Sequence, residues 1–570
     1  MIYLKTILVL AGLGSYLVPL HYFPWTAFHS EALFFFFAAL LPLYLAASGK
    51  TYCISRSQLY TLSIIVSLIL ITSLLFAKSS FFVAFSYLSC AALAYLCGTM
   101  RSQSKSSAND LIFILILIIT LAATASVLIA IIQHLQVFNS IHVTELRRGG
   151  RPYANLAQPN NLGTLLLMGI ACLLYLNLKK IISKSFLLGA IFFFCIGISL
   201  TQSRTAMLGF LILAAFWSLC RLPDNHHVAI KRKVREFFYL AAILFTSLIL
   251  VTNISQFLLI SDTSIVDRGV HSSQRVTIWL QLLHAAAQKP ILGYGFHNVS
   301  EATVEISTSL STSTYSEYAH NLFLDFAIWF GIPIGALLSV GVIYWLASRL
   351  LTYKTSEQFL GLAIILVVFS HSMFELPHAY SYFLIPVAIM AGIVDSSRQY
   401  PETMTSASTW IFWILGITGI ALCTVSTIEY LKIEQAHRNM RFASARIGPI
   451  QPPVEFPSSI LFPELTEFIN FAQTEAKEDM SREDLDRMQR VAHNKAFPPA
   501  LFRYALALGL NDQPEAAALE LRRLRALHGD QHYEEARASW IGLTERYPQL
   551  GRVAFPIATE SQSFPARGAD

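Results

Sequence analysis

The sequence is poor in charged residues, and the few that it has are unevenly placed. Only 13% of the 570 residues are charged and 54% are hydrophobic, whereas about 25% are charged in an ordinary soluble protein. Residues 1–431 hold 24 Lys and Arg and 16 Asp and Glu, while residues 432–570 hold 17 and 19. This split excludes a soluble globular enzyme, a fibrous protein and a disordered chain. It predicts a membrane domain over residues 1–431 and a water-soluble domain over residues 432–570.

Cysteine is also scarce, and none of the seven lies beyond Cys423. The charged tail therefore has no disulfide framework and no CxxC metal site. The first apolar segment, residues 2–20, has no small-residue cleavage site before His21 and Pro24. We expect that segment to be a first spanning helix and not a cleaved signal peptide.

Apolar runs of about 20 residues, the length that crosses a bilayer, are frequent before residue 432. They predict an all-α polytopic membrane protein with about 13 transmembrane helices, in which the run 320–348 is one span. With the N-terminus in the cytoplasm, the loops place 16 Lys and Arg inside and 8 outside, in line with the positive-inside tendency. An odd number of spans then puts residues 432–570 outside.

The basic residues expected outside are biased towards arginine, with six Arg and two Lys. The planar guanidinium contacts phosphate oxygens in pairs and keeps its proton. An outer anion site explains the bias, although each residue alone also fits an exposed loop. The six are Arg147, Arg148, Arg151, Arg204, Arg268 and Arg275.

Two outer loops are long, and the first covers residues 135–161. It places Gly149, Gly150 and three of the arginines before a helix start that carries Gln158 and Asn160. Backbone N–H groups at the positive end of a helix dipole favour an anion. A turn with an asparagine cap is the alternative interpretation.

The second long loop, residues 261–319, leads directly to His320 at the start of an apolar run. The residues Glu317 and Asn321 flank this histidine. A helix N-terminus disfavours the imidazolium and keeps the ring neutral, as a general base requires. Ionisable residues at the end of a membrane helix are functional candidates, although a single histidine is more often structural.

Two further outer segments carry ionisable residues. The hairpin from His371 to Tyr380 includes Glu375, but no HExxH motif or paired acidic cluster supports a metal site. The first outer loop holds His21 and Glu31. The residues alone therefore predict an outward-facing site for an anionic, membrane-borne substrate, without identifying the reaction.

Taken in order, these motifs resemble the O-antigen ligase/polymerase superfamily over about residues 1–430. Two of the segments, Pro19 to Glu31 and His371 to Tyr380, are similar to those of bacterial protein O-oligosaccharyltransferases that glycosylate type IV pilins. The other motifs are Gly150-Arg151-Pro152 with Asn155, Gln158-Pro159-Asn160, Ser203-Arg204, Arg275 with Trp279, Pro290-x2-Gly293-x-Gly295, and Ala319-His320-Asn321 with Gly331 and Gly335.

The resemblance implies a GT-C-like fold in the bacterial inner membrane, with the tail in the periplasm. It implies transfer of a preassembled oligosaccharide from undecaprenyl pyrophosphate to a Ser or Thr hydroxyl of a periplasmic protein such as pilin, without a cofactor or metal. His320 matches the histidine implicated in the family and is the expected base. Arginines would hold the leaving pyrophosphate; Arg151, Arg204 and Arg275 are the first candidates, followed by Arg147, Arg148 and Arg268. The expected wall of the site is Gln158, Asn160, Glu317, Asn321, His371, Glu375, His21 and Glu31.

The tail has helical periodicity over residues 484–547. Two apolar stretches flank Gly509–Pro514, a spacing similar to a single tetratricopeptide-like pair. Fewer than three repeats seldom stand alone, so we expect the pair to pack on other helices. It serves either to dock the acceptor protein or as a structural appendage.

Three other functions remain open from the sequence. An O-antigen ligase would use lipid A core as acceptor, and an O-antigen polymerase would extend a glycan. A transporter should carry charged or broken helices near the middle of the membrane. Here the polar residues gather at the outer ends of the spans, which favours an enzyme.

Overall fold

Helices make up nearly all of the structure. The computed structural model describes residues 2–48, 52–55, 59–60, 63–64, 66–67, 71, 81–102, 106–136, 140–147, 149–219, 230–258, 260, 273–310, 313–396, 404–445 and 458–555. These residues form 20 α-helices, short 3-10 turns and one small sheet.

Within the described residues, eight helices are long and apolar enough to cross a membrane, and four shorter ones are also apolar. This confirms a helical, multi-pass membrane protein. A further apolar run, at residues 59–77, also predicts a span, but it lies mostly outside the described residues. The eight are α2 (Phe28–Ala47), α4 (Phe81–Thr99), α5 (Ser106–Leu135), α6 (Pro159–Leu178), α7 (Lys184–Thr201), α9 (Ile230–Phe257), α13 (Ile332–Thr352) and α16 (Thr409–Ser444). The shorter four are α1 (Ile2–Leu17), α8 (Arg204–Ser218), α14 (Ser356–Ser372) and α15 (Ser381–Ser396).

The small sheet is an exception to the expected all-α fold. Strand β1 (Tyr52–Ser55) pairs antiparallel with both β2 (Arg101–Ser102) and β3 (Met404–Ala407). It joins loop segments that apolar periodicity does not detect, because strands this short have no pattern of their own.

Helix α6 is enclosed by its neighbours. Its residues from Asn160 to Tyr175 are buried, and it packs against α5, α7, α8 and α14. A helix that is apolar all round belongs inside a bundle. Pro159 starts the helix, since proline at the first position gives up no helical hydrogen bond. The polar residues of α6 are therefore fixed at one end of the bundle.

The run 320–348, which we expected to be one span, is broken into two helices, so that prediction was wrong. Helix α12 (Leu322–Phe330) ends at Gly331, whose φ of +82° is left-handed, and α13 follows. The Pro290–Gly295 segment lies against the break. The N–H of Tyr294 donates to the Ile328 carbonyl at 2.7 Å, and that of Ile332 donates to the Pro290 carbonyl at 2.7 Å. This segment therefore holds α12 in position.

Replacing Gly293 tests how much this contact contributes to folding. Its φ is +67°, and a Cβ would lie 2.4 Å from the Ile328 carbonyl oxygen. We expect Gly293→Ala to destabilise the chain by about 1–3 kcal/mol, measured as a lower midpoint of thermal unfolding in detergent. Gly341→Ala on α13 is the matched control, because nothing lies within 4 Å of its Cβ and alanine favours a helix. Equal midpoints for the two variants would contradict this role.

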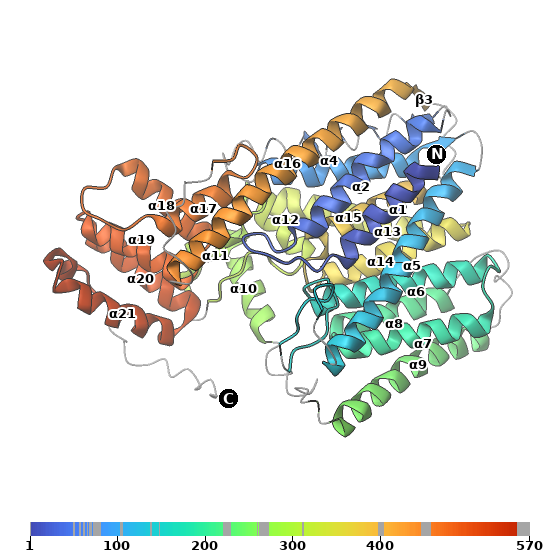
Figure 1. Ribbon diagram of the computed structural model, residues 1–570, viewed down its shortest axis with the longest axis horizontal. Helices are drawn as coiled ribbons and strands as arrows, with labels where there is room; N and C mark the ends of the chain where they lie inside the picture. Colours follow the sequence, from blue (N-terminus) through green and yellow to red (C-terminus); the bar gives the residue numbers. More distant parts are fainter. Residues whose placement is uncertain are drawn as a thin grey trace.

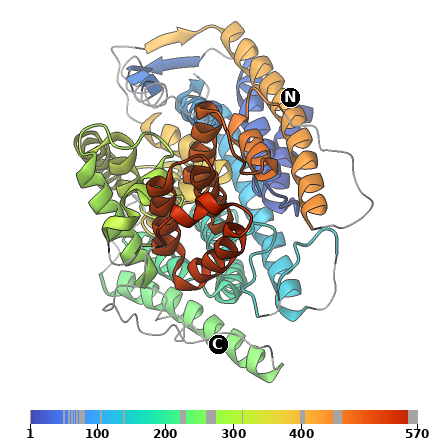
Figure 2. The same cartoon turned by 90° about the vertical axis from the view of Figure 1, so that its left-hand side faces the viewer.

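Helix α16 passes through the predicted boundary at residue 431 without interruption. Its 36 residues extend for about 54 Å, well beyond a hydrocarbon core of about 30 Å. Its far end joins a helical module at one end of the bundle (Figures 1 and 2). The module consists of α17 (Pro463–Gln473), α18 (Arg482–Asn494), α19 (Pro498–Leu510), α20 (Pro514–His528), α21 (Asp530–Thr544) and the 3-10 turn η5 (Pro548–Arg552).

The module shares a hydrophobic core with the second long loop of the membrane domain. That loop forms α10 (Ser273–Gln288), α11 (Val299–Ile306) and the 3-10 turn η3 (Ser307–Ser309). Val304 of α11 is buried among apolar side chains of the module. The Ser300 hydroxyl donates to the Asn494 carbonyl at 2.8 Å. The tail thus packs on other helices, as expected for a segment with fewer than three repeats.

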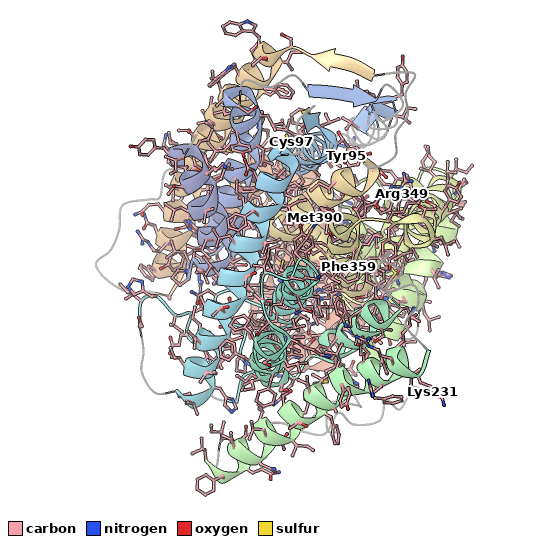
Figure 3. All side chains as sticks on the ribbon, turned by 90° about the vertical axis from the view of Figure 1, so that its right-hand side faces the viewer. Tyr95, Cys97, Lys231, Arg349, Phe359 and Met390 are labelled. Carbon is pink, nitrogen blue, oxygen red and sulfur yellow. The ribbon has the colours of Figure 1, made fainter. Side chains whose placement is uncertain are left out.

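The opposite end of the bundle is held by a carboxylate near the end of α15. Asp395 accepts from the Tyr95 hydroxyl at 2.8 Å and the Trp345 indole at 3.1 Å, and it pairs with Arg349 at 2.6 Å. Figure 3, which views this end, labels Tyr95 and Arg349. These contacts join α4, α13 and α15 on the side away from the module.

Candidate active site

The carboxylate of Glu375 connects three segments that are far apart in the sequence. It follows the end of α14 and is 4% exposed. One oxygen accepts hydrogen bonds from the Arg275 guanidinium and from the Asn160 amide at 2.8 Å. The other oxygen lies 3.0 Å from His320 Nδ1. A buried carboxylate requires such partners, so these four residues form one polar cluster.

The contact with Glu375 determines which nitrogen of His320 is available for chemistry. An ionised carboxylate only accepts hydrogen bonds, so Nδ1 carries the proton of the neutral ring. The other nitrogen, Nε2, then holds a lone pair that can accept a proton. The side chain remains 26% exposed, which leaves the ring open to a substrate.

The backbone around His320 is fixed by three neighbours. His320 has a left-handed φ of +53°, a conformation that persists in non-glycine residues where the surroundings impose it. The Trp279 indole donates to the Ala319 carbonyl at 3.0 Å, and Asp325 accepts from the Ala319 N–H at 3.0 Å. Asn321 caps α12 by accepting from two backbone N–H groups.

Neighbouring charges and burial shift the pKa of Glu375 in opposite directions. Burial raises the pKa of this carboxyl, but the hydrogen bond from His320 and the charges of Arg275 and the neighbouring histidines lower it, and together they outweigh burial. The resulting pKa is below the usual value. Glu375 therefore stays ionised, and able to orient His320, at pH values where an ordinary glutamate is partly protonated.

The cluster extends through α6 to the start of α8. The Asn160 oxygen accepts from the Ser203 hydroxyl at 2.7 Å, and Ser203 in turn caps α8. Arg204 is the first residue of α8 and is exposed. Sequence order thus places Arg204 directly beside the network that ends at Glu375.

His371 is a neighbour of the cluster. It is 2% exposed, and its Nδ1 lies 2.7 Å from the Thr164 hydroxyl, one turn after Asn160. Its backbone carbonyl accepts from the Glu375 N–H at 2.9 Å. His371 therefore ties α14 and the Glu375 turn to α6. The described residues contain no group of three His, Cys, Asp or Glu that could hold a metal ion.

The first long loop is held in place by hydrogen bonds from Asn155 and Gln133, which the sequence did not connect with each other. Asn155 donates to the Leu17 and His142 carbonyls, at 2.7 and 2.9 Å. Gln133 of α5 donates to the Ala154 carbonyl at 2.8 Å. Arg151 is half-buried before this anchored segment, and Arg147 is exposed. Arg148 and Arg268 lie outside the described residues.

Three of the expected wall residues contact other parts of the protein. His21 lies between two backbone carbonyls, those of Thr26 and Asn155, each at 3.0 Å. Glu31 is buried and accepts from the Ser381 N–H at 2.8 Å. Glu317 pairs with Lys495 of the module at 2.8 Å. Of the remaining wall residues, Gln158 precedes α6 as its half-buried N-cap residue, and Asn321 donates to the Met373 carbonyl at 3.2 Å.

Sequence reasoning missed several residues that support the cluster. Thr164 and Gln133 lie inside apolar helices and carry no motif of their own. Their spacing is nevertheless informative, since Thr164 follows Asn160 by four residues and so shares its helix face. Glu375 was expected as part of a wall, whereas the structure places it in contact with both His320 and Arg275.

Comparisons with known proteins match several of the segments that form this site. Residues 188–339 match the family described as O-antigen ligase, and residues 359–540 match that described as virulence factor membrane-bound polymerase, C-terminal. The chain is 28% identical over 546 residues to a general O-oligosaccharyltransferase of Acinetobacter baylyi, covering 92% of this chain and 93% of that protein. It is also 28% identical to a ComP-specific O-oligosaccharyltransferase of the same species, over 59% of this chain and 60% of that protein.

These matches include the segments that carry Arg204, Arg275, His320 and Glu375. Together with the helical membrane fold, they indicate a membrane glycosyltransferase that is similar to the O-antigen ligase family. Both curated relatives are O-oligosaccharyltransferases, and the chain is an oligosaccharyltransferase, a kind of glycosyltransferase.

Proposed function

We propose that this chain transfers a preassembled oligosaccharide from undecaprenyl pyrophosphate to a Ser or Thr hydroxyl of a periplasmic protein, such as a type IV pilin. The observation that carries the proposal is the Glu375 carboxylate, which contacts a candidate base and a candidate phosphate ligand at once. A hydroxyl nucleophile and a pyrophosphate leaving group need these two kinds of residue.

In the proposed reaction, His320 Nε2 accepts the proton of the acceptor hydroxyl as its oxygen attacks C1 of the sugar. The bond between C1 and the pyrophosphate oxygen breaks as the new glycosidic bond forms, so the configuration at C1 is inverted. The pyrophosphate leaves with the electron pair, and arginines stabilise its charge. Arg275, Arg204 and Arg151 are the first candidates, and Arg147, Arg148 and Arg268 follow them.

The donor role of Arg275 is tested by a substitution that keeps its charge. Lysine cannot form the paired contacts of a guanidinium, so Arg275→Lys should raise the KM for the lipid-linked donor about tenfold or more. Purified chain and donor in detergent give this value directly. Arg232→Lys is a suitable control, since Arg232 is exposed on α9 and pairs with Glu236. An unchanged donor KM would leave Arg275 with only a structural role.

We further propose that the N-terminus is cytoplasmic and the module periplasmic, in the bacterial inner membrane. The support is that the N-terminus and the module lie at opposite ends of the bundle (Figure 1). The module, in which α19 and α20 form a tetratricopeptide-like pair, would then lie on the same side as the Glu375 cluster.

A gene deletion distinguishes this proposal from its nearest alternatives. Loss of glycan from a periplasmic protein, with lipopolysaccharide unchanged on a gel, would support a protein acceptor. A change in lipopolysaccharide alone would instead indicate an O-antigen ligase or polymerase.

A further inference from the structure

The module and the loop that leads to His320 form a cavity of about 730 Å³ between them. The loop contributes Thr314 and Tyr315, and the module contributes residues of α19, α20 and α21. Cavities of this size hold several side chains of a ligand. We call it the junction groove.

The lining of the junction groove is largely apolar. It includes Phe497, Phe502, Leu524 and Leu527, together with Pro498 and Pro499 at the start of α19. The Tyr315 ring lies 5.7 Å from that of Phe497, edge to face. Its hydroxyl donates to the Asn494 carbonyl at 2.9 Å, which fixes the ring as a wall of the groove.

The charges of the groove do not suit the pyrophosphate donor. Among the described residues that line it, none is Lys or Arg; there are two histidines, His528 and His532, and one carboxylate, Glu535. An anion would find a carboxylate there and no guanidinium. The polyprenyl chain of the donor is also an unsuitable occupant, because it stays in the bilayer, whereas the module is rich in charge.

The groove adjoins the contacts between the module and the loop that leads to His320, and this limits its distance from the site. Tyr315 lines the groove and His320 follows it by five residues. Five residues of extended chain span at most about 18 Å. A second extended segment that runs alongside would reach from the groove to Nε2 of His320 in about six residues.

We infer that the junction groove binds an extended segment of the acceptor polypeptide, whose apolar or aromatic side chains anchor it about six residues from the glycosylated hydroxyl. This inference rests on the proposed function. Large rigid apolar side chains in a pocket provide most of the affinity of such contacts. The groove thereby selects the acceptor, while the Glu375 cluster acts on the donor and the hydroxyl.

Two variants change the volume of the groove in opposite ways, one by removing a side chain and the other by adding one. Phe497→Ala removes an exposed part of its wall, and Ser539→Trp fills its edge. Ile541→Ala is the matched control, because Ile541 is an exposed apolar residue of α21 that does not line the groove. The probe is a synthetic peptide from the protein that loses its glycan on gene deletion, with about ten residues on each side of the modified hydroxyl.

We expect both groove variants of the full chain to raise the KM for this peptide about tenfold, with the KM for the donor and the kcat at saturating peptide unchanged. Limited proteolysis should show the same resistant fragments as wild type. Photo-crosslinking from Phe497→p-benzoylphenylalanine should capture the peptide. Wild-type peptide KM in both variants, or crosslinks only to a second copy of this chain, would overturn the groove while leaving the proposed function intact. A wild-type chain that transfers glycan to no polypeptide would overturn both.

Discussion

Replacing His320 with alanine should abolish glycan transfer while the chain still inserts in the membrane. General-base catalysis contributes about 10²–10⁴-fold to rate, so we expect kcat to fall by at least about 100-fold. The ring is 26% exposed, and its removal leaves the Glu375 carboxylate with Arg275 and Asn160 as partners. Folding should therefore survive the substitution. Transfer to the acceptor protein in cells and in detergent measures the effect.

A histidine of the second long loop provides the control. His284 is exposed on α10, and His284→Ala should retain wild-type kcat and membrane level. Normal acceptor glycosylation by His320→Ala, at equal amounts of protein, would end the assignment of His320 as base.

Replacing Glu375 with glutamine should produce the second large effect, with a different kinetic signature. Glutamine keeps the shape but removes the negative charge that orients His320 and partly neutralises Arg275. We expect kcat to fall about 100-fold, since misplacing a catalytic group costs about that much. The KM for the donor should stay the same or fall, because Arg275 becomes free to contact phosphate. Glu375→Asp should recover part of kcat.

The pH dependence separates this role from simple packing. Because the pKa of Glu375 lies below its usual value, the stabilisation from its charge is present above the ordinary glutamate pKa. It is lost only as the pH falls through the lower, folded-state value. Wild-type kcat should therefore show no separate loss from Glu375 near pH 4–5. A rise in donor KM for Glu375→Gln, with kcat unchanged, would show that the carboxylate only supports donor binding.

The helices could be predicted from the sequence more completely than the contacts between them. Apolar runs of spanning length indicate membrane helices directly, and His320 is recognisable because its signal is local to one helix start. The break at Gly331 is hidden because the apolar run continues across it. It depends on the Pro290 and Tyr294 backbone contacts, which no periodicity records.

The central place of Glu375 could not be read from the sequence. Its partners are 55, 100 and 215 residues away along the chain, so only the folded bundle brings them together. The same holds for Glu317, which is close to His320 in the sequence but turns to Lys495 of the module. Their proximity in the sequence predicted that Glu317 and His320 share one site. In the structure His320 contacts Glu375, whereas Glu317 contacts the module.

The uninterrupted helix α16 and the buried Val304 together constrain how acceptor preference could be exchanged between relatives. A chimera cut at residue 431 would sever α16 in mid-helix and leave Val304 facing a foreign core. A chimera that folds would have to exchange three pieces together, namely residues 299–315, all of α16 and the module. The module therefore has to be exchanged together with a loop that lies more than one hundred residues before it in the sequence.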